Sequence, residues 1–178
     1  AEAMAMCVNI AGGHDTPRTF LVDQGCHPQT VAVVRTRAEA LGVLVVTVDA
    51  LAPLPIDAAA PVCGLLLQYP SSAGALIDWR ETVARAHEAG AQVVMAADVL
   101  ALVSLTSPGE LGADIAVGNT QRFGVPMGFG GPHAAYIATR SEHARRMPGR
   151  IIGVSRDSHG DVALRMAIQT REQHIRRE

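Results

Sequence analysis

Acidic side chains stand just past several apolar runs of the sequence, at positions where a protein could do chemistry. Asp98 follows the run 92–96, and a carboxylate at the end of a strand could hold the pyridinium nitrogen of a bound cofactor. The same carboxylate could instead cap the backbone that follows it, and the sequence leaves both roles open. Asp23 and Asp49 also end apolar runs, and for both of them capping is the favoured interpretation.

Cys26 and His27 invite a thiol–base interpretation. A nucleophile and its base meet in space rather than along the chain, so adjacency in sequence supports this pair only weakly. A buried structural thiol is the favoured role for Cys26, and a ring that stacks on a cofactor is an alternative for His27. The three cysteines are widely spaced and odd in number, which is typical of a reduced cytosolic protein rather than a disulfide scaffold.

A glycine-rich loop lies between two short apolar runs, in the segment ADIAVGNTQRFGVPMGFGGPH at 113–133. Glycines let the backbone approach a ligand or another chain closely. The loop lacks the GK[ST] of a P-loop, and it is not a GxGxxG motif that opens a helix. It could therefore receive a phosphate, meet a neighbouring subunit, or form a tight connection between strands.

Several functional classes find little support in the sequence. No CxxC or HExxH spacing is present, so we expect no metal site. Apolar runs stay well short of the roughly 20 residues that span a membrane, and the first six residues do not resemble a signal peptide. The arginines of the last third lack interleaved aromatic residues and the chain has a formal net charge of −2, so we expect no nucleic-acid partner.

The elements that must position these side chains alternate between strands and helices. With 48% hydrophobic residues and a mean hydropathy of +0.19, the chain can bury a substantial core. The alternation predicts an α/β fold with a mostly parallel sheet covered on both faces. The predicted strands are 19–22, 43–48, 62–67, 92–96 and 115–117, and the predicted helices are 1–11, 28–41 and 79–89. The β-branched run 43–48 is predicted to be buried, and Asp78 and Glu81 predict a capping box at the start of the helix 79–89.

The second half of the chain departs from this alternation. The loop before 134–138 has no helical pattern, and a parallel return normally needs a helical crossover, so this strand is predicted to be antiparallel. A short buried helix is predicted at 99–105, and Ser141 is predicted to cap a short arginine-rich helix. The runs 150–154 and 162–168 predict a hairpin.

The acidic and basic residues are unevenly distributed, with an acidic excess in 1–139 and a basic excess in 140–178. All 15 basic residues are arginine, with six arginines against 12 acids in 1–139 and nine against five in 140–178. The basic segment could face an anionic partner or pair with acids elsewhere in a larger protein. Both ends of the sequence are predicted to be interrupted helices. The helix at the C-terminal end would start with a capping box at Thr170 and Gln173. We therefore expect a piece of a longer chain. The arginine- and alanine-rich composition favours a bacterial, cytoplasmic protein.

Three stretches carry a family resemblance: QRFGVPMGFGGPH, MPGRIIGVSRDSHG and ALRMAIQTREQHIRRE. They are similar to the N-terminal half of the glycine decarboxylase (P-protein) family of the glycine cleavage system. The resemblance is dense over 98–178 and looser back through LVDQGCHPQT at 21–30. It implies a three-layer α/β/α large domain of the fold-type-I pyridoxal phosphate (PLP) enzymes at 1–149. Residues 150–178 would be a connecting hairpin and the start of a helix leading to the rest of the chain.

The resemblance also implies a reaction and a missing residue. The family decarboxylates glycine on PLP and passes the aminomethyl group to the lipoyl arm of H-protein. Holding PLP as a Schiff base requires a lysine, and none of the 178 residues is lysine. The family lysine stands in the C-terminal half, in a motif resembling HKxFxxPxGGGGP, and matching Val125 and Pro126 to its xP pair puts Gln121 at the lysine position. This segment alone is therefore predicted to be inactive.

The resemblance implies a supporting role beside the active half. Asp98 and His27 are candidate contacts to PLP, which would be anchored outside this segment. The implied partners are the C-terminal half, lipoylated H-protein, glycine and further copies of the parent enzyme. The alternative is a stand-alone α/β binding or scaffold domain that uses the loop from Gly124 to His133 for a phosphate or a partner. The residues predicted to face the active half are Asn119, Gln121, Arg122, Phe123, Gly124, Gly128, Gly130, Gly131 and His133.

Overall fold

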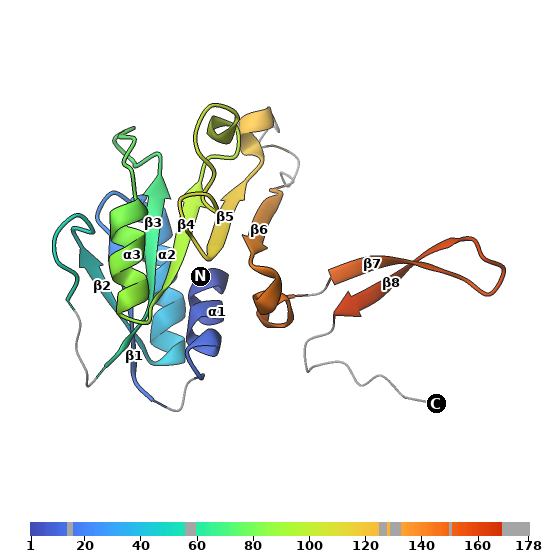
Figure 1. Ribbon diagram of the computed structural model, residues 1–178, viewed down its shortest axis with the longest axis horizontal. Coiled ribbons are helices and arrows are strands. Elements are labelled where there is room, and N and C mark those ends of the chain that lie inside the picture. The colour runs from blue at the N-terminus through green and yellow to red at the C-terminus, as the bar shows by residue number, and fades with distance from the viewer. Residues whose placement is uncertain (14–15, 56–59, 125–127, 129–132, 150, 169–178) are drawn as a thin grey trace.

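The computed structural model describes residues 1–13, 16–55, 60–124, 128, 133–149 and 151–168. Figure 1 shows an α/β body followed by a separate hairpin. The helices are α1 (Glu2–Ile10), α2 (Pro28–Leu41) and α3 (Arg80–Glu88), and three 3₁₀ turns are η1 (Ala101–Val103), η2 (Gln121–Phe123) and η3 (Ser141–Arg146). The strands are β1 (Arg18–Asp23), β2 (Val43–Val48), β3 (Val62–Tyr69), β4 (Gln92–Ala97), β5 (Ile115–Asn119), β6 (Ala135–Thr139), β7 (Ile151–Arg156) and β8 (Val162–Ile168).

Six strands form one sheet in the order β2-β1-β3-β4-β5-β6. The first five strands are parallel. β6 runs antiparallel to β5, with Ile115 opposite Thr139 and Asn119 opposite Ala135. The predicted antiparallel strand is thus confirmed, and the predicted hairpin is confirmed as the β7–β8 pair.

Helices cover the sheet on both faces, which gives the predicted three layers. Side chains of α1 and α2 pack with Phe20 and Leu66 in one apolar cluster. Trp79 and α3 pack with Leu65 and Met95 in a second cluster on the other face. β3 lies inside the sheet and all eight of its residues are buried. This is why its sequence reads as an almost continuous apolar run rather than an alternating one.

Local sequence signals account for the helix boundaries. Pro28 occupies the first turn of α2, where its missing N–H costs nothing. Gly42 ends the same helix at φ 66°, and its N–H bonds back to the last turn. Gly12 and Gly13 end α1 in the same way, and the Gly13 N–H donates to the Val8 carbonyl at 2.9 Å.

Four local predictions were wrong. β2 is not buried, because it forms the edge of the sheet and leaves Leu44 58% exposed. The segment 99–105 forms only the turn η1, where Val103 is 82% exposed. η3 has no side-chain cap from Ser141. α3 lacks the predicted capping box, and Asp78 instead accepts the Arg80 N–H at 3.2 Å.

Candidate functional site

The carboxyl ends of β1, β3, β4 and β5 meet at one edge of the sheet, because these strands are parallel and adjacent. Ligand sites of open α/β sheets lie beyond this edge. We call the polar groups there the crest. It consists of His27, Ser72, Asp98, Asn119 and Arg122, which follow or end these four strands.

Asp98 and Arg122 form an ion pair in the crest. Arg122 Nε lies 3.0 Å from Asp98 Oδ2, and their side chains are 64% and 24% exposed respectively. The other carboxylate oxygen, Oδ1, accepts the Leu100 N–H at 3.1 Å. Asp98 therefore has the capping role, one of the two that the sequence left open, and it also forms an ion pair that its place in the sequence did not indicate. Its charge is already partnered within this chain.

Tyr136 ties β6 to the end of β4 beside this pair. Its phenol donates to the Ala97 carbonyl at 2.9 Å. Burial raises the pKa of Tyr136, and the nearby charge of Asp98 raises it further. The ring passes over Gly118, where a Cβ would lie 2.5 Å from both the Ala97 oxygen and the Tyr136 ring. Gly118 is thus the residue that lets the tyrosine reach β4.

Cys26 and His27 do not act as a thiol–base pair in the described geometry. His27, exposed at the start of α2, has Nδ1 2.7 Å from Ser72 Oγ. Cys26 is 3% exposed and its thiol donates to the Leu66 carbonyl at 3.6 Å. Burial raises the pKa of Cys26 to about 12, with a smaller contribution from Asp23. The buried structural role favoured for Cys26 fits this setting.

Cys26 is therefore expected to resist alkylation in the folded protein. With a pKa of about 12, only about one thiol in ten thousand is a thiolate at pH 8, and the thiolate is the reactive form. Mass spectrometry after iodoacetamide treatment should show Cys26 modified in urea and unmodified without it. A cysteine placed at exposed Ser104 is the control and should react in both conditions. Fast native labelling of Cys26 would contradict its burial.

The other strand-end aspartates hold turns, as predicted. The buried carboxylate of Asp23 accepts the Gly25 N–H at 2.8 Å and the Ala50 N–H at 3.1 Å. Asp49 accepts the Leu51 N–H at 3.0 Å. Both carboxylates close the backbone that leaves a strand, which is the common role of aspartate in turns.

The loop predicted to face the active half is described only at its two ends. Asn119 Oδ1 accepts the Gln121 N–H at 3.1 Å, which starts η2 at the end of β5. Arg122 and Phe123 are exposed, the latter by 58%, and Gly124 ends the turn at φ 87°. Gly128 and His133 are exposed. Gly130 and Gly131 lie outside the described residues, so the facing surface as a whole stays a prediction.

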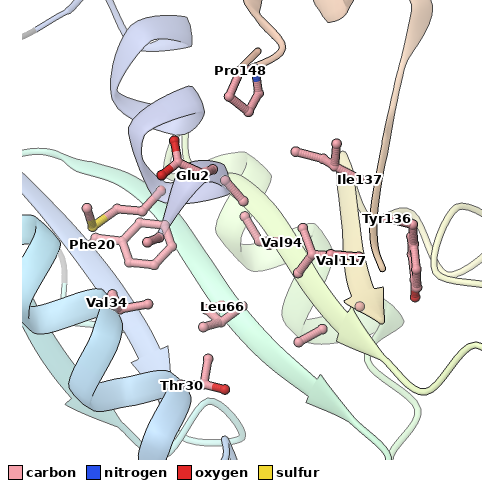
Figure 2. Close-up of a pocket in the computed structure, with 16 residues that line it drawn as sticks. Glu2, Phe20, Thr30, Val34, Leu66, Val94, Val117, Tyr136, Ile137 and Pro148 are labelled. Atoms are coloured by element: carbon pink, nitrogen blue, oxygen red, sulfur yellow. The ribbon is translucent and has the colours of Figure 1, made fainter. Parts of the chain in front are cut away.

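An apolar cavity of about 340 Å³ opens below the crest on the α1 and α2 face of the sheet. In Figure 2, Phe20 and Val34 stand opposite Val117 and Ile137 across it. Glu2 and Thr30 supply polar groups, and none of the side chains that line it is basic. This lining suits an apolar group better than a phosphate.

Neither a metal centre nor a spanning helix emerges from the part of the chain that the structure describes. There, no group of three His, Cys, Asp or Glu side chains could hold a metal ion. Equally, none of its helices has the length and apolar character needed to cross a membrane.

The residues of this segment do not fit the anchoring of PLP. None of the 178 residues is a lysine that could form the Schiff base. The carboxylate that could hold a pyridinium nitrogen instead holds the guanidinium of Arg122 at 3.0 Å. A positively charged ring nitrogen would have to share this carboxylate with a guanidinium that is already in contact with it.

The sequence analysis overlooked Tyr136 and Gly118. These residues are direct partners in the antiparallel β5–β6 register. An aromatic residue opposite a glycine on neighbouring strands is a recognised cross-strand arrangement. This pairing could not be predicted, because the length of the loop between β5 and β6 does not determine which residues of the two strands lie opposite each other.

Comparison with known proteins agrees with this architecture. The family model of the glycine cleavage system P-protein matches residues 1–178. The chain is 58% identical over 179 residues to mitochondrial glycine dehydrogenase (decarboxylating) of Solanum tuberosum, covering 100% of this chain and 17% of that protein. It is 53% identical over 178 residues to glycine dehydrogenase (decarboxylating) of Synechocystis sp., covering 100% and 18%. The chain thus spans less than a fifth of the length of these curated relatives.

Solved structures give the same answer for the fold. A glycine decarboxylase (P-protein) of the glycine cleavage system, in inhibitor-bound form, matches with a TM-score of 0.78 and 35% identity over 94% of this chain and 38% of that chain. Cystathionine gamma lyase from Micromonospora echinospora matches with a TM-score of 0.60 and 23% identity over 82% and 38%, which shows the shared fold alone. The sheet and its helices are those of the fold-type-I PLP enzymes, and the chain belongs to the glycine cleavage system P-protein family.

Proposed function

We propose that this chain is part of a PLP-dependent glycine decarboxylase. The complete enzyme would release CO₂ from glycine and pass the aminomethyl group to the lipoyl arm of H-protein. This segment would be the half that does not anchor PLP and that helps complete the site of the active half. The relatives that support the proposal are named glycine dehydrogenase (decarboxylating).

One observation carries the role of this segment. The fold presents a carboxylate at the edge of the sheet where ligand sites of open α/β sheets lie, yet Asp98 is paired with Arg122 at 3.0 Å and the segment has no lysine. The crest therefore lies where a cofactor site of this fold is expected, without a lysine that would anchor PLP. Such a surface can still position a neighbour, because Arg122 in the crest and Phe123 next to it are exposed.

The chemistry that PLP supplies is electron withdrawal from the carbon next to the amine. The residues of this segment would support the PLP site of the active half by contacting its loops, without touching PLP themselves. Arg122 can donate hydrogen bonds from the nitrogens that do not face Asp98, and Phe123 offers an apolar ring. Together they would fix the position of a loop of the active half, and small misplacements of such a loop can cost about a hundredfold in rate.

Exchanging Arg122 for methionine in the full-length enzyme tests this role. The Arg122→Met variant should lose about tenfold or more in glycine-dependent turnover, since it breaks a positioning contact. Its PLP content, measured by absorbance and by borohydride reduction, should not change. Arg80→Met is the matched control, because Arg80 also pairs with an aspartate, Asp78, at 2.6 Å on an exposed surface outside the crest.

Two outcomes would contradict the proposal in different ways. Loss of PLP from Arg122→Met would show that this half does hold the cofactor. Unchanged turnover would reduce the segment to a scaffold and remove its supporting role. An unaffected Arg80→Met enzyme is needed in either case to exclude a general effect of losing a surface charge.

The remaining expectations stay predictions. They are a homo-oligomeric parent enzyme, a cytoplasmic location, the division of the chain near residue 149, and the helix that starts after 168, which lies outside the described residues. The alternative of a stand-alone phosphate-binding or scaffold domain depends on the loop from Gly124 to His133, most of which also lies outside them.

A further inference from the structure

The apolar cavity of about 340 Å³ on the α1 and α2 face of the sheet has no part in the proposed function. Protein interiors are packed as densely as organic crystals, and few of their voids exceed the size of a water molecule. Small-molecule sites, in contrast, are mostly apolar hollows of about 300–1,000 Å³. The size of this cavity therefore matches a ligand site better than a packing defect.

The inner wall of the cavity belongs to the core of the domain. Phe20 of β1, Val34 of α2 and Leu66 of β3 line it, and they are 1%, 1% and 4% exposed. Met4 of α1 and Val94 of β4 complete this wall and are equally buried. All five side chains belong to one packed cluster. The wall is thus formed before any ligand arrives, and a preorganised site loses little conformational entropy on binding.

The outer wall comes from the antiparallel pair at the end of the sheet. Val117 of β5 lies opposite Ile137 of β6, and both side chains are half-buried. Ala135 lies on the same face of β6 as Ile137, because alternate residues of a strand project to one side, and it also lines the cavity. Figure 2 shows Phe20 and Val34 on the other side of the space. Apolar side chains on both sides therefore lack the contacts that a molecule between them would supply.

The polar groups of the lining indicate the charge of the ligand. Of the described side chains that line the cavity, none is basic, so a bound anion would lose its hydration without gaining a partner. The carboxylate of Glu2 lies 3.3 Å from the guanidinium of Arg37, and both side chains are 54% exposed. The charge of Glu2 is thus already paired at the surface. Thr30 brings a hydroxyl group to the cavity, which can form one directional hydrogen bond.

We propose that this cavity binds an uncharged, mostly apolar small molecule of about the size of two fused rings. An apolar cavity of about 150 Å³ is large enough for benzene or xenon, and the cavity of this chain has about twice that volume. The bound molecule would bridge the core wall and the β5–β6 pair. This site is separate from the crest, and the inference does not depend on the proposed function.

Titration of the full-length protein with indole, measured by isothermal titration calorimetry, tests the site. Indole is an uncharged molecule of two fused rings, and its N–H can donate to the Thr30 hydroxyl. We expect a Kd below about 1 mM, which is within reach of a ligand of this size. Indole-3-carboxylate should bind at least about tenfold more weakly, because its charge would be buried without a partner.

Two variants that fill the cavity locate the bound indole. Val117→Phe and Ala135→Phe place a ring in the space, and each should weaken indole binding at least about tenfold, since two groups cannot occupy one close-packed volume. Val103→Phe is the matched control, because Val103 is 82% exposed and does not line the cavity, and its Kd should equal that of the unmodified protein. Circular dichroism checks the folding of each variant. Ala135 is exposed, so its variant still decides the question if Val117→Phe does not fold.

Three results would overturn the inference. Absence of indole binding would show that the cavity is closed in the full-length protein, by the rest of the chain or by another copy. Equal affinities for indole and its carboxylate would contradict the preference for an uncharged ligand. An unchanged Kd in the folded, filled variants would place the indole elsewhere. The turnover and PLP content of Arg122→Met, which judge the proposed function, are independent of all three.

Discussion

Alanine in place of Gly118 is expected to lower the free energy of unfolding by about 3 kcal/mol, at the upper end of the usual overpacking cost. The added Cβ would lie 2.5 Å from the Ala97 carbonyl oxygen and 2.5 Å from the Tyr136 ring. One obstacle is backbone of the adjacent strand, which cannot turn aside as a side chain can. β4 and β5 would have to separate next to the crest, so the Tyr136–Ala97 hydrogen bond of 2.9 Å should be lost as well.

Urea unfolding followed by circular dichroism measures this effect. Gly109→Ala is the matched control, because a Cβ at Gly109 would meet nothing within 4 Å, and it should leave stability nearly unchanged. Adding Tyr136→Ala should not rescue Gly118→Ala, since the clash with the Ala97 oxygen remains. Full rescue would show that the ring alone excludes a side chain at 118.

Asp114→Ala is expected to cost about 3 kcal/mol, because it leaves buried donors without their acceptor. Asp114 is 6% exposed. Its Oδ2 accepts the Val93 N–H at 2.8 Å and lies 2.7 Å from His87 Nε2. Its Oδ1 lies 3.1 Å from Arg140 Nε. The Arg140 side chain is 49% exposed, so water screens that ion pair and the buried Val93 N–H accounts for most of the loss.

A variant of an exposed aspartate shows how much of the stability lost in Asp114→Ala is due to burial of the carboxylate rather than to the loss of its charge. Asp78→Ala removes an aspartate that pairs with Arg80 at 2.6 Å, but this pair is 62% and 57% exposed. Exposed ion pairs contribute about 0–1 kcal/mol, and the Arg80 N–H also loses its acceptor at a cost of about 1 kcal/mol, so the loss of stability should stay clearly below that of Asp114→Ala. Equal losses in the two variants would mean that the Asp114 network does not hold β4 and β5 at their amino-terminal ends.

Much of the fold could be predicted because its signals are local. Pro28 and Gly42 delimit α2 by the backbone angles that they permit. The apolar run 62–67 predicted the strand β3, and the alternation of strands and helices predicted a sheet covered on both faces. The loop before β6 is too poor in helical pattern for a parallel crossover, and this alone predicted the antiparallel strand.

Local sequence signals could not predict which strands are buried and which are exposed. An apolar, β-branched run looks the same in the centre of a sheet and at its edge. β2 was predicted to be buried, yet Leu44 is 58% exposed because β2 is the edge strand. The segment 99–105 failed for a related reason, since its apolar run forms only the turn η1, which buries none of its residues.

The sequence by itself determined which groups are available: an aspartate after a buried strand, a glycine-rich loop and no lysine. Those facts, with the family resemblance, predict that this segment does not anchor PLP. Only the tertiary structure decided which groups meet. Arg122 lies 24 positions from Asp98 and reaches it because β4 and β5 are neighbours with aligned ends. Contacts between residues so far apart depend on strand order and register, which arise from the packing of the whole sheet rather than from local preference.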